Sequence, residues 1–155
     1  MQAQIFFPAI LLSFIGLFIG YFLAYQTDEE ENDIKKYVKL SQFALILIFT
    51  IATSVMAGIN FWIGALFAIM VGLTFFFIKV PSHLYYPILG VLTYFGSLNQ
   101  DLFYVQTFLV FTIGITIGTF NYWDNKKTKW YHNYLTLFYQ NISFIIIATI
   151  LFFLF

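Results

Sequence analysis

Long apolar stretches separated by short polar segments fill most of this 155-residue chain. Such stretches run over residues of about 5–25, 39–57, 61–79, 84–98, 102–120 and 134–155. Most are apolar on every side for about 20 residues, the length that an α-helix needs to cross a hydrocarbon core of about 30 Å. Strands of a transmembrane barrel would instead alternate apolar and polar residues over about ten positions. The pattern therefore predicts an all-α, polytopic integral membrane protein, with one transmembrane domain that forms a six-transmembrane-helix bundle.

Composition supports a membrane environment. The chain is 61% hydrophobic and only 9% charged, whereas soluble domains carry roughly 25% charged residues. A soluble protein of this length would have too few polar side chains to cover its surface. In lipid, spanning segments satisfy their backbone groups internally as helices or closed barrels, and the absence of alternation favours helices.

The polar block over residues 27–39 contains five of the seven acids and three of the seven lysines. Because this block cannot lie in hydrocarbon, it must separate the first span from the second. Its four consecutive carboxylates, Asp28 to Glu31, point in different directions on a helix and so do not converge on a metal. Acids are also favourable at a helix N-terminus. We expect the second helix to begin in water, about two turns before the membrane.

The stretch 84–98 is short, contains Pro87 and two glycines, and has two interpretations. It either crosses the membrane or forms a re-entrant segment, which would leave five full spans. If it crosses, all seven lysines lie on one side; if it is re-entrant, the last three move to the other side. The positive-inside tendency favours six spans. We therefore expect both termini outside, and loops 26–38, 80–83 and 121–133 in the cytoplasm, in the cell or inner membrane.

Small residues recur at four-residue spacing in several of the predicted spans. Gly16 and Gly20 lie in the first span, Gly64 and Gly72 flank Ala68 in the third, and Gly114-x-x-x-Gly118 lies in the fifth. Small residues let two transmembrane helices approach closely. We expect these stripes to face other helices.

No Asp, Glu, Lys, Arg or His falls at mid-membrane depth, and the chain has no cysteine. Proton-coupled carriers and voltage sensors need an ionisable group within the membrane. A serine nucleophile needs an adjacent base, and no histidine lies at the depth of the intramembrane serines. The sequence therefore indicates no catalytic residue and no cofactor, which favours a protein that is not an enzyme.

Four polar residues near the outer ends of the helices form the candidate ligand site: Asn60, Asn99, Asp101 and Gln106. The alternative is that short turns simply need hydrogen-bonding side chains. His83 and His132 are weak metal candidates, because they lie about 50 residues apart and lack the close spacing of helical metal motifs. We predict no metal site.

The second polar loop combines cations with aromatic residues: Lys126, Lys127, Lys129 and Trp130. Because it adjoins two spans, its lysines are placed to attract anionic lipid headgroups, and its rings to lie at the membrane interface. We expect contact with membrane lipids and none with nucleic acid.

Two classes of function remain open. The first is a small non-catalytic subunit or scaffold, whose partners are other membrane protein subunits or further copies of this chain. The second is a small oligomeric permease or channel for a neutral solute. A lipid-modifying membrane enzyme that uses His83 or His132 is a third hypothesis. Minimal loops, the small-residue stripes and the apolar membrane interior favour the subunit.

Overall fold

The computed structural model describes residues 3–27, 31–77, 82–125 and 130–154. The helices are α1 (Ala3–Gln26), α2 (Glu31–Met56), α3 (Phe61–Phe77), α4 (Ser82–Gly96), α5 (Gln100–Asp124), α6 (Trp130–Asn141) and α7 (Ser143–Leu154). No strand occurs within these ranges. The predicted all-α membrane helix bundle is confirmed.

Four segments are long and apolar enough to cross a membrane. They are α1, α5, the part of α2 over Ile34–Val55, and the stretch Asn133–Leu154 that α6 and α7 form together. In contrast, α3 has 17 residues and α4 has 15. At 1.5 Å per residue they measure about 26 Å and about 22 Å, less than a hydrocarbon core of about 30 Å. The question whether residues 84–98 cross the membrane therefore involves two short helices, α3 and α4.

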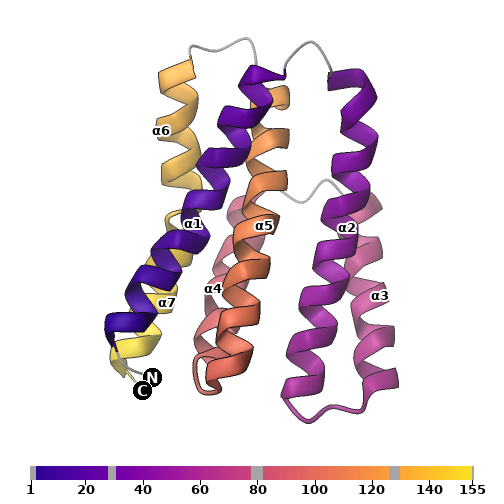
Figure 1. Cartoon of the computed structure of the whole chain (residues 1–155), viewed down its shortest axis with the longest axis vertical. Helices are drawn as coiled ribbons and strands as arrows, with labels where there is room; N and C mark the ends of the chain where they lie inside the picture. The colour runs from indigo at the N-terminus through magenta and orange to yellow at the C-terminus, as the bar shows by residue number, and fades with distance from the viewer. Residues whose placement is uncertain (1–2, 28–30, 78–81, 126–129, 155) are drawn as a thin grey trace.

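The helices alternate in direction along the chain (Figure 1). In the view of Figure 1, α1, α3 and α5 rise, whereas α2, α4 and the α6–α7 pair descend. The chain therefore begins and ends at the same end of the bundle. Because α3 and α4 run in opposite directions, this holds whether the pair crosses the membrane or turns back within it. Which side of the membrane holds the termini stays a prediction.

Helices α1 and α5 run parallel and pack along their whole length at the centre of the bundle. Their glycines bring the two backbones into direct contact. A Cβ atom on Gly16 would meet the Phe111 carbonyl, and one on Gly118 would meet the Leu17 carbonyl. The stripes predicted in the first and fifth spans therefore face each other, as small residues at close helix crossings do.

Hydroxyl groups join the same two helices. The Ser13 Oγ atom donates to the Thr107 carbonyl oxygen over 3.1 Å, and Thr119 Oγ1 donates to the Gly20 carbonyl oxygen over 3.2 Å. Each hydroxyl also bonds to a carbonyl of its own helix. The close glycine approach brings the carbonyls of one helix within reach of the side chains of the other.

Helices α2 and α3 form an antiparallel hairpin, called here the α2–α3 arm. Gly72 of α3 lies against the Phe43 and Leu47 side chains of α2, so the stripe of the third span faces α2. The arm joins the rest of the bundle mainly through α2, which packs against α5 and contributes Ile46 and Phe49 to the core. Helix α2 begins at Glu31, and its candidate span begins at Ile34; the expected start about two turns before the membrane stays a prediction.

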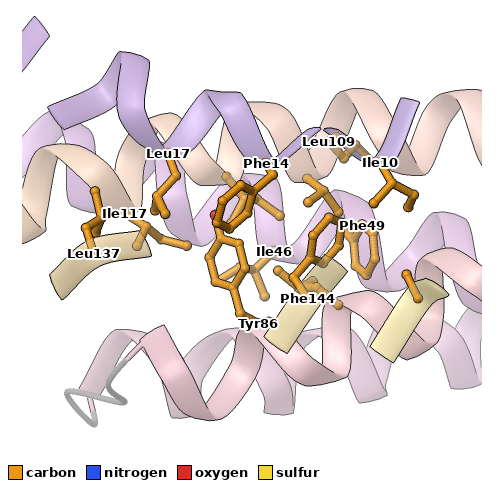
Figure 2. Packing of buried hydrophobic residues seen from close by; sticks show 14 of the residues in the cluster. Ile10, Phe14, Leu17, Ile46, Phe49, Tyr86, Leu109, Ile117, Leu137 and Phe144 are labelled. Atoms are coloured by element: carbon orange, nitrogen blue, oxygen red, sulfur yellow. The ribbon is translucent and has the colours of Figure 1, made fainter. Parts of the chain in front are cut away.

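Aromatic side chains fill the space between α1, α4 and α7 (Figure 2). The ring centroid of Tyr86 lies 5.8 Å from that of Phe144 and 6.4 Å from that of Phe14, and both pairs are T-shaped. Rings prefer such edge-to-face contacts. Gly90 of α4 lies against the backbone of Phe144, with a Cβ position 2.7 Å from its carbonyl oxygen. This approach holds α4 against α7.

The sixth predicted span, 134–155, is not one uninterrupted helix. Helix α6 ends at Asn141 and α7 begins at Ser143. The Asn141 side chain is fully buried, and its Nδ2 atom donates to the Leu137 carbonyl oxygen over 2.8 Å. An asparagine side chain that bonds to nearby backbone competes with regular helix bonding. That competition gives a physical reason for the break at this position.

Candidate functional site

Two of the predicted ligand residues cap helices. Asn99 Oδ1 accepts hydrogen bonds from the backbone N–H groups of Asp101 and Leu102, over 3.0 and 3.3 Å, at the start of α5. Asn60 Oδ1 accepts a bond from the Trp62 N–H over 3.0 Å at the start of α3. Side-chain oxygens at these positions satisfy N–H groups that the helix leaves without partners. Asn60, Asn99 and Asp101 are all exposed.

Gln106, the fourth predicted ligand residue, lies inside the bundle with 0% exposure. Its Nε2 atom donates to Thr53 Oγ1 of α2 over 2.9 Å. Its amide oxygen lies against Gly96 of α4 and has no hydrogen-bond partner among the described residues. The seven residues from Asn99 to Gln106 correspond to about 10 Å along a helix. Gln106 therefore links α2, α4 and α5 and does not join the exposed residues at the helix ends.

Several predicted site residues lie outside the part of the chain that the structure describes. Lys126, Lys127 and Lys129 fall in the range 126–129, and the side chains of Trp130 and of the two histidines, His83 and His132, are likewise not described. Their roles in lipid or metal binding stay predictions. Within the described residues, no group of three or more His, Cys, Asp or Glu side chains is placed to hold a metal ion.

A cavity of about 300 Å³ lies where α1 ends and α6 begins. It is called here the tyrosine pocket, and it is lined by Tyr21, Phe22, Tyr25 and Tyr134. Tyr21 is 1% exposed, whereas Phe22 and Tyr25 are 50% and 57% exposed. The pocket therefore has a buried wall and an open side.

The aromatic rings around the tyrosine pocket contact one another. The Tyr21 ring centroid lies 4.6 Å from that of Tyr134 and 5.2 Å from that of Tyr122. Tyr25 also contacts Tyr122, at 6.0 Å and nearly perpendicular. The rings thus connect α1, α5 and α6 at the end of the bundle where the polar block follows α1.

Polar side chains also make contacts at this end of the bundle. The Asn133 side chain is a hydrogen-bond partner of the Tyr21 hydroxyl, although this contact lacks the geometry of a normal hydrogen bond. Asn133 Nδ2 donates to the Asn125 carbonyl oxygen over 2.9 Å, which fixes the start of α6 against the end of α5. At the same end of the bundle, Lys35 Nζ of α2 lies 5.8 Å from the ring centroid of Trp123 of α5, a cation–π distance.

Sequence reasoning did not identify the tyrosine pocket. One signal was present: Tyr21 and Tyr25 are four residues apart and so lie on one face of a helix. The chain offers no comparable signal that Tyr134 of α6 joins them. Comparison of the chain with protein-family models, with curated proteins and with solved structures finds no match.

Proposed function

We propose that this chain is a small non-catalytic subunit or scaffold of a larger membrane assembly, and that it binds another membrane protein through the α2–α3 arm. The observation that carries the proposal is the peripheral position of α3. Within the described ranges α3 packs against α2 and hardly against any other helix. In Figure 1 the arm forms one side of the molecule.

The outer face of the arm is strongly apolar. Trp62, Leu66 and Met70 of α3 are 73%, 65% and 68% exposed, and Phe77 at its end is 77% exposed. In the most apolar stretch of α2, only 17% of the residues are buried within the chain. Lipid or a second protein must cover this surface in a membrane, and a protein partner can supply specific packing that lipid tails do not.

The lengths of α3 and α4 favour a protein partner over lipid. The described part of α3 is about 26 Å long and that of α4 about 22 Å, and both are shorter than a core of about 30 Å. Oligomerisation is one of the ways in which a short hydrophobic helix accommodates such a mismatch. In Figure 1 the end of α3 and the start of α4 lie well below the upper ends of α2 and α5. A partner helix beside the arm would cover the remaining depth.

The buried polar groups also fit a structural role. A permease for a neutral solute needs hydroxyl and amide groups that remain available to the solute. Here the hydroxyls of Ser13 and Thr119 bond to backbone carbonyls of the facing helix. Gln106 Nε2 donates to Thr53 of α2, while the Gln106 amide oxygen has no partner among the described residues. These groups hold helices together, which supports the subunit over the permease.

Site-specific photo-crosslinking in native membranes tests the proposal. A photoreactive phenylalanine analogue replaces Leu66 or Met70 on the arm, or Leu11 or Leu12 on the exposed face of α1 as matched controls. The controls are suitable because Leu11 and Leu12 are also apolar and more than half exposed. We expect one defined protein adduct from the arm positions and none from α1. Only lipid adducts at all four positions would contradict the proposal.

A further inference from the structure

The tyrosine pocket has the composition of a site for a weakly hydrated cation. Its lining consists of three phenol rings and one phenyl ring, from Tyr21, Tyr25, Tyr134 and Phe22. The faces of aromatic rings carry negative potential, and they attract cations within about 6 Å of the ring centroid. Among the residues that the structure describes, the lining has no carboxylate, so the rings are its means of attracting a cation. The described lining also has no lysine or arginine that could bind an anion.

We propose that the tyrosine pocket binds a quaternary ammonium group, such as the trimethylammonium of choline. Aromatic cages recognise this group because it has no N–H to satisfy and loses little hydration when buried. The volume of about 300 Å³ is at the lower end of the range for small-molecule sites, about 300–1,000 Å³. A trimethylammonium group with its adjoining carbons fits a site of this size.

The buried wall of the pocket offers a second, independent indication of a ligand. Tyr21 is 1% exposed, and its hydroxyl meets the Asn133 side chain in a contact that lacks normal hydrogen-bond geometry. Buried hydroxyls usually have partners, and an exception calls for an explanation. A ligand with a hydroxyl or phosphate next to its ammonium group would supply Tyr21 with a hydrogen bond of normal geometry.

The position of the pocket favours a headgroup over a lipid tail. Tyr25 lies in the last turn of α1 and Tyr134 in the second turn of α6, so the pocket is at the ends of the helices, where tyrosines meet lipid headgroups. Half-exposed Phe22 and Tyr25 leave the side of the pocket open. The same ammonium chemistry occurs in choline lipids and in free choline, and both sources fit this opening.

Saturation-transfer NMR on the protein in maltoside micelles measures the proposed binding. The probes are choline and its neutral carbon isostere, in which a tert-butyl group replaces the trimethylammonium. The variants Tyr25→Leu and Tyr25→Trp change a ring that is more than half exposed, so both are expected to fold. The matched control is Tyr139→Leu, which alters a 71% exposed tyrosine of α6 outside the pocket lining.

We expect choline to bind and the neutral isostere to bind more weakly. Tyr25→Leu should weaken choline binding about 2- to 5-fold, since an exposed cation–π contact contributes about 0.5–1 kcal/mol. Tyr25→Trp should retain the affinity or improve it, and Tyr139→Leu should leave it unchanged. Equal binding of the isostere, or equal loss in Tyr25→Leu and Tyr139→Leu, would overturn the proposal.

Nanodiscs distinguish the two sources of the ligand. Phosphatidylcholine nanodiscs should suppress the signal of added choline relative to phosphatidylglycerol nanodiscs if the lipid headgroup occupies the site. An equal signal in both identifies free choline as the ligand, and either result supports ammonium binding. The proposal concerns the α1–α6 end of the molecule and does not depend on whether the α2–α3 arm binds a protein.

Discussion

Replacing Gly118 by alanine tests the contact between α1 and α5 at one of its closest points. A Cβ atom at Gly118 would meet the carbonyl of Leu17 and would lie 2.7 Å from the amide nitrogen of Tyr21. Both groups belong to the α1 backbone, and neither can rotate away. The two helices must separate to admit the methyl group, and their packing and hydroxyl bonds then weaken together.

The expected cost follows from these two effects. Overpacking a well-packed site costs about 1–3 kcal/mol. Thr119 is the next residue, and weakening its bond to the Gly20 carbonyl forfeits part of an intramembrane hydrogen bond, which averages about 0.6 kcal/mol. We therefore expect Gly118→Ala to reduce the free energy of unfolding by about 1–3.5 kcal/mol relative to its control.

The matched control is Gly72→Ala in the α2–α3 arm. A Cβ atom there would meet the ends of the Phe43 and Leu47 side chains, which can move by a few tenths of an ångström. Both variants gain the same helix propensity, about 1 kcal/mol, so the difference between them isolates the backbone contact. Steric trapping in bicelles measures the free energy of unfolding. Equal stability of the two variants would refute the inferred contact between the α1 and α5 backbones.

Three further predictions concern the arm, the topology and a helix cap. Gln106→Leu should reduce the free energy of unfolding by about 0.6–1.7 kcal/mol, and a double-mutant cycle with Thr53→Val should show coupling; additive losses would mean that the bond contributes nothing. Single cysteines at Gln26 and Asn125 should react with an impermeant thiol reagent from one side of the membrane and a cysteine at Asn99 from the other; labelling of all three from one side would exclude the predicted topology. Asn99→Ala should cost about 0.5–2 kcal/mol because α5 loses its cap, and unchanged steric-trapping stability would contradict that role.

The sequence predicted the features that depend on length and on residue size. The apolar stretches gave α1, α2 and α5, because crossing a membrane requires a long uncharged helix. The glycine stripes at Gly16 and Gly118 predicted close helix contacts, since only small residues permit them. Neither kind of signal identifies which two stripes meet, and the parallel pairing of α1 with α5 came from the structure.

The orientation of each helix was not predictable, because lipid and the protein core are both apolar. In the most apolar stretch of α5, 67% of the residues are buried, against 17% in α2, although both stretches are strongly hydrophobic. Gln106 illustrates the consequence. It was grouped with the polar residues at the helix ends, but it faces α2 and α4 inside the bundle. The sequence alone does not indicate whether a polar side chain near the end of an apolar stretch faces the bundle interior or the membrane surface.

The tyrosine pocket depends on contacts between residues that are far apart in the sequence. Tyr21, Tyr122 and Tyr134 come from three different helices, and each alone resembles an ordinary interfacial tyrosine. The predicted set of Asn60, Asn99 and Asp101 shows the opposite case, because the two asparagines cap helices and all three residues are exposed. Their shared ligand site stays a prediction.

The mass of the protein released from native membranes tests the central claim most directly. The chain, extracted in native nanodiscs without conventional detergent, is analysed by native mass spectrometry after gentle release of lipid. We predict an assembly of fixed stoichiometry, containing a second membrane protein that is lost when bulky charged residues replace Leu66 and Met70 on the α2–α3 arm. A lone 18.1 kDa chain bound only to lipid, in both the original protein and the variant, would contradict the proposed role as a subunit.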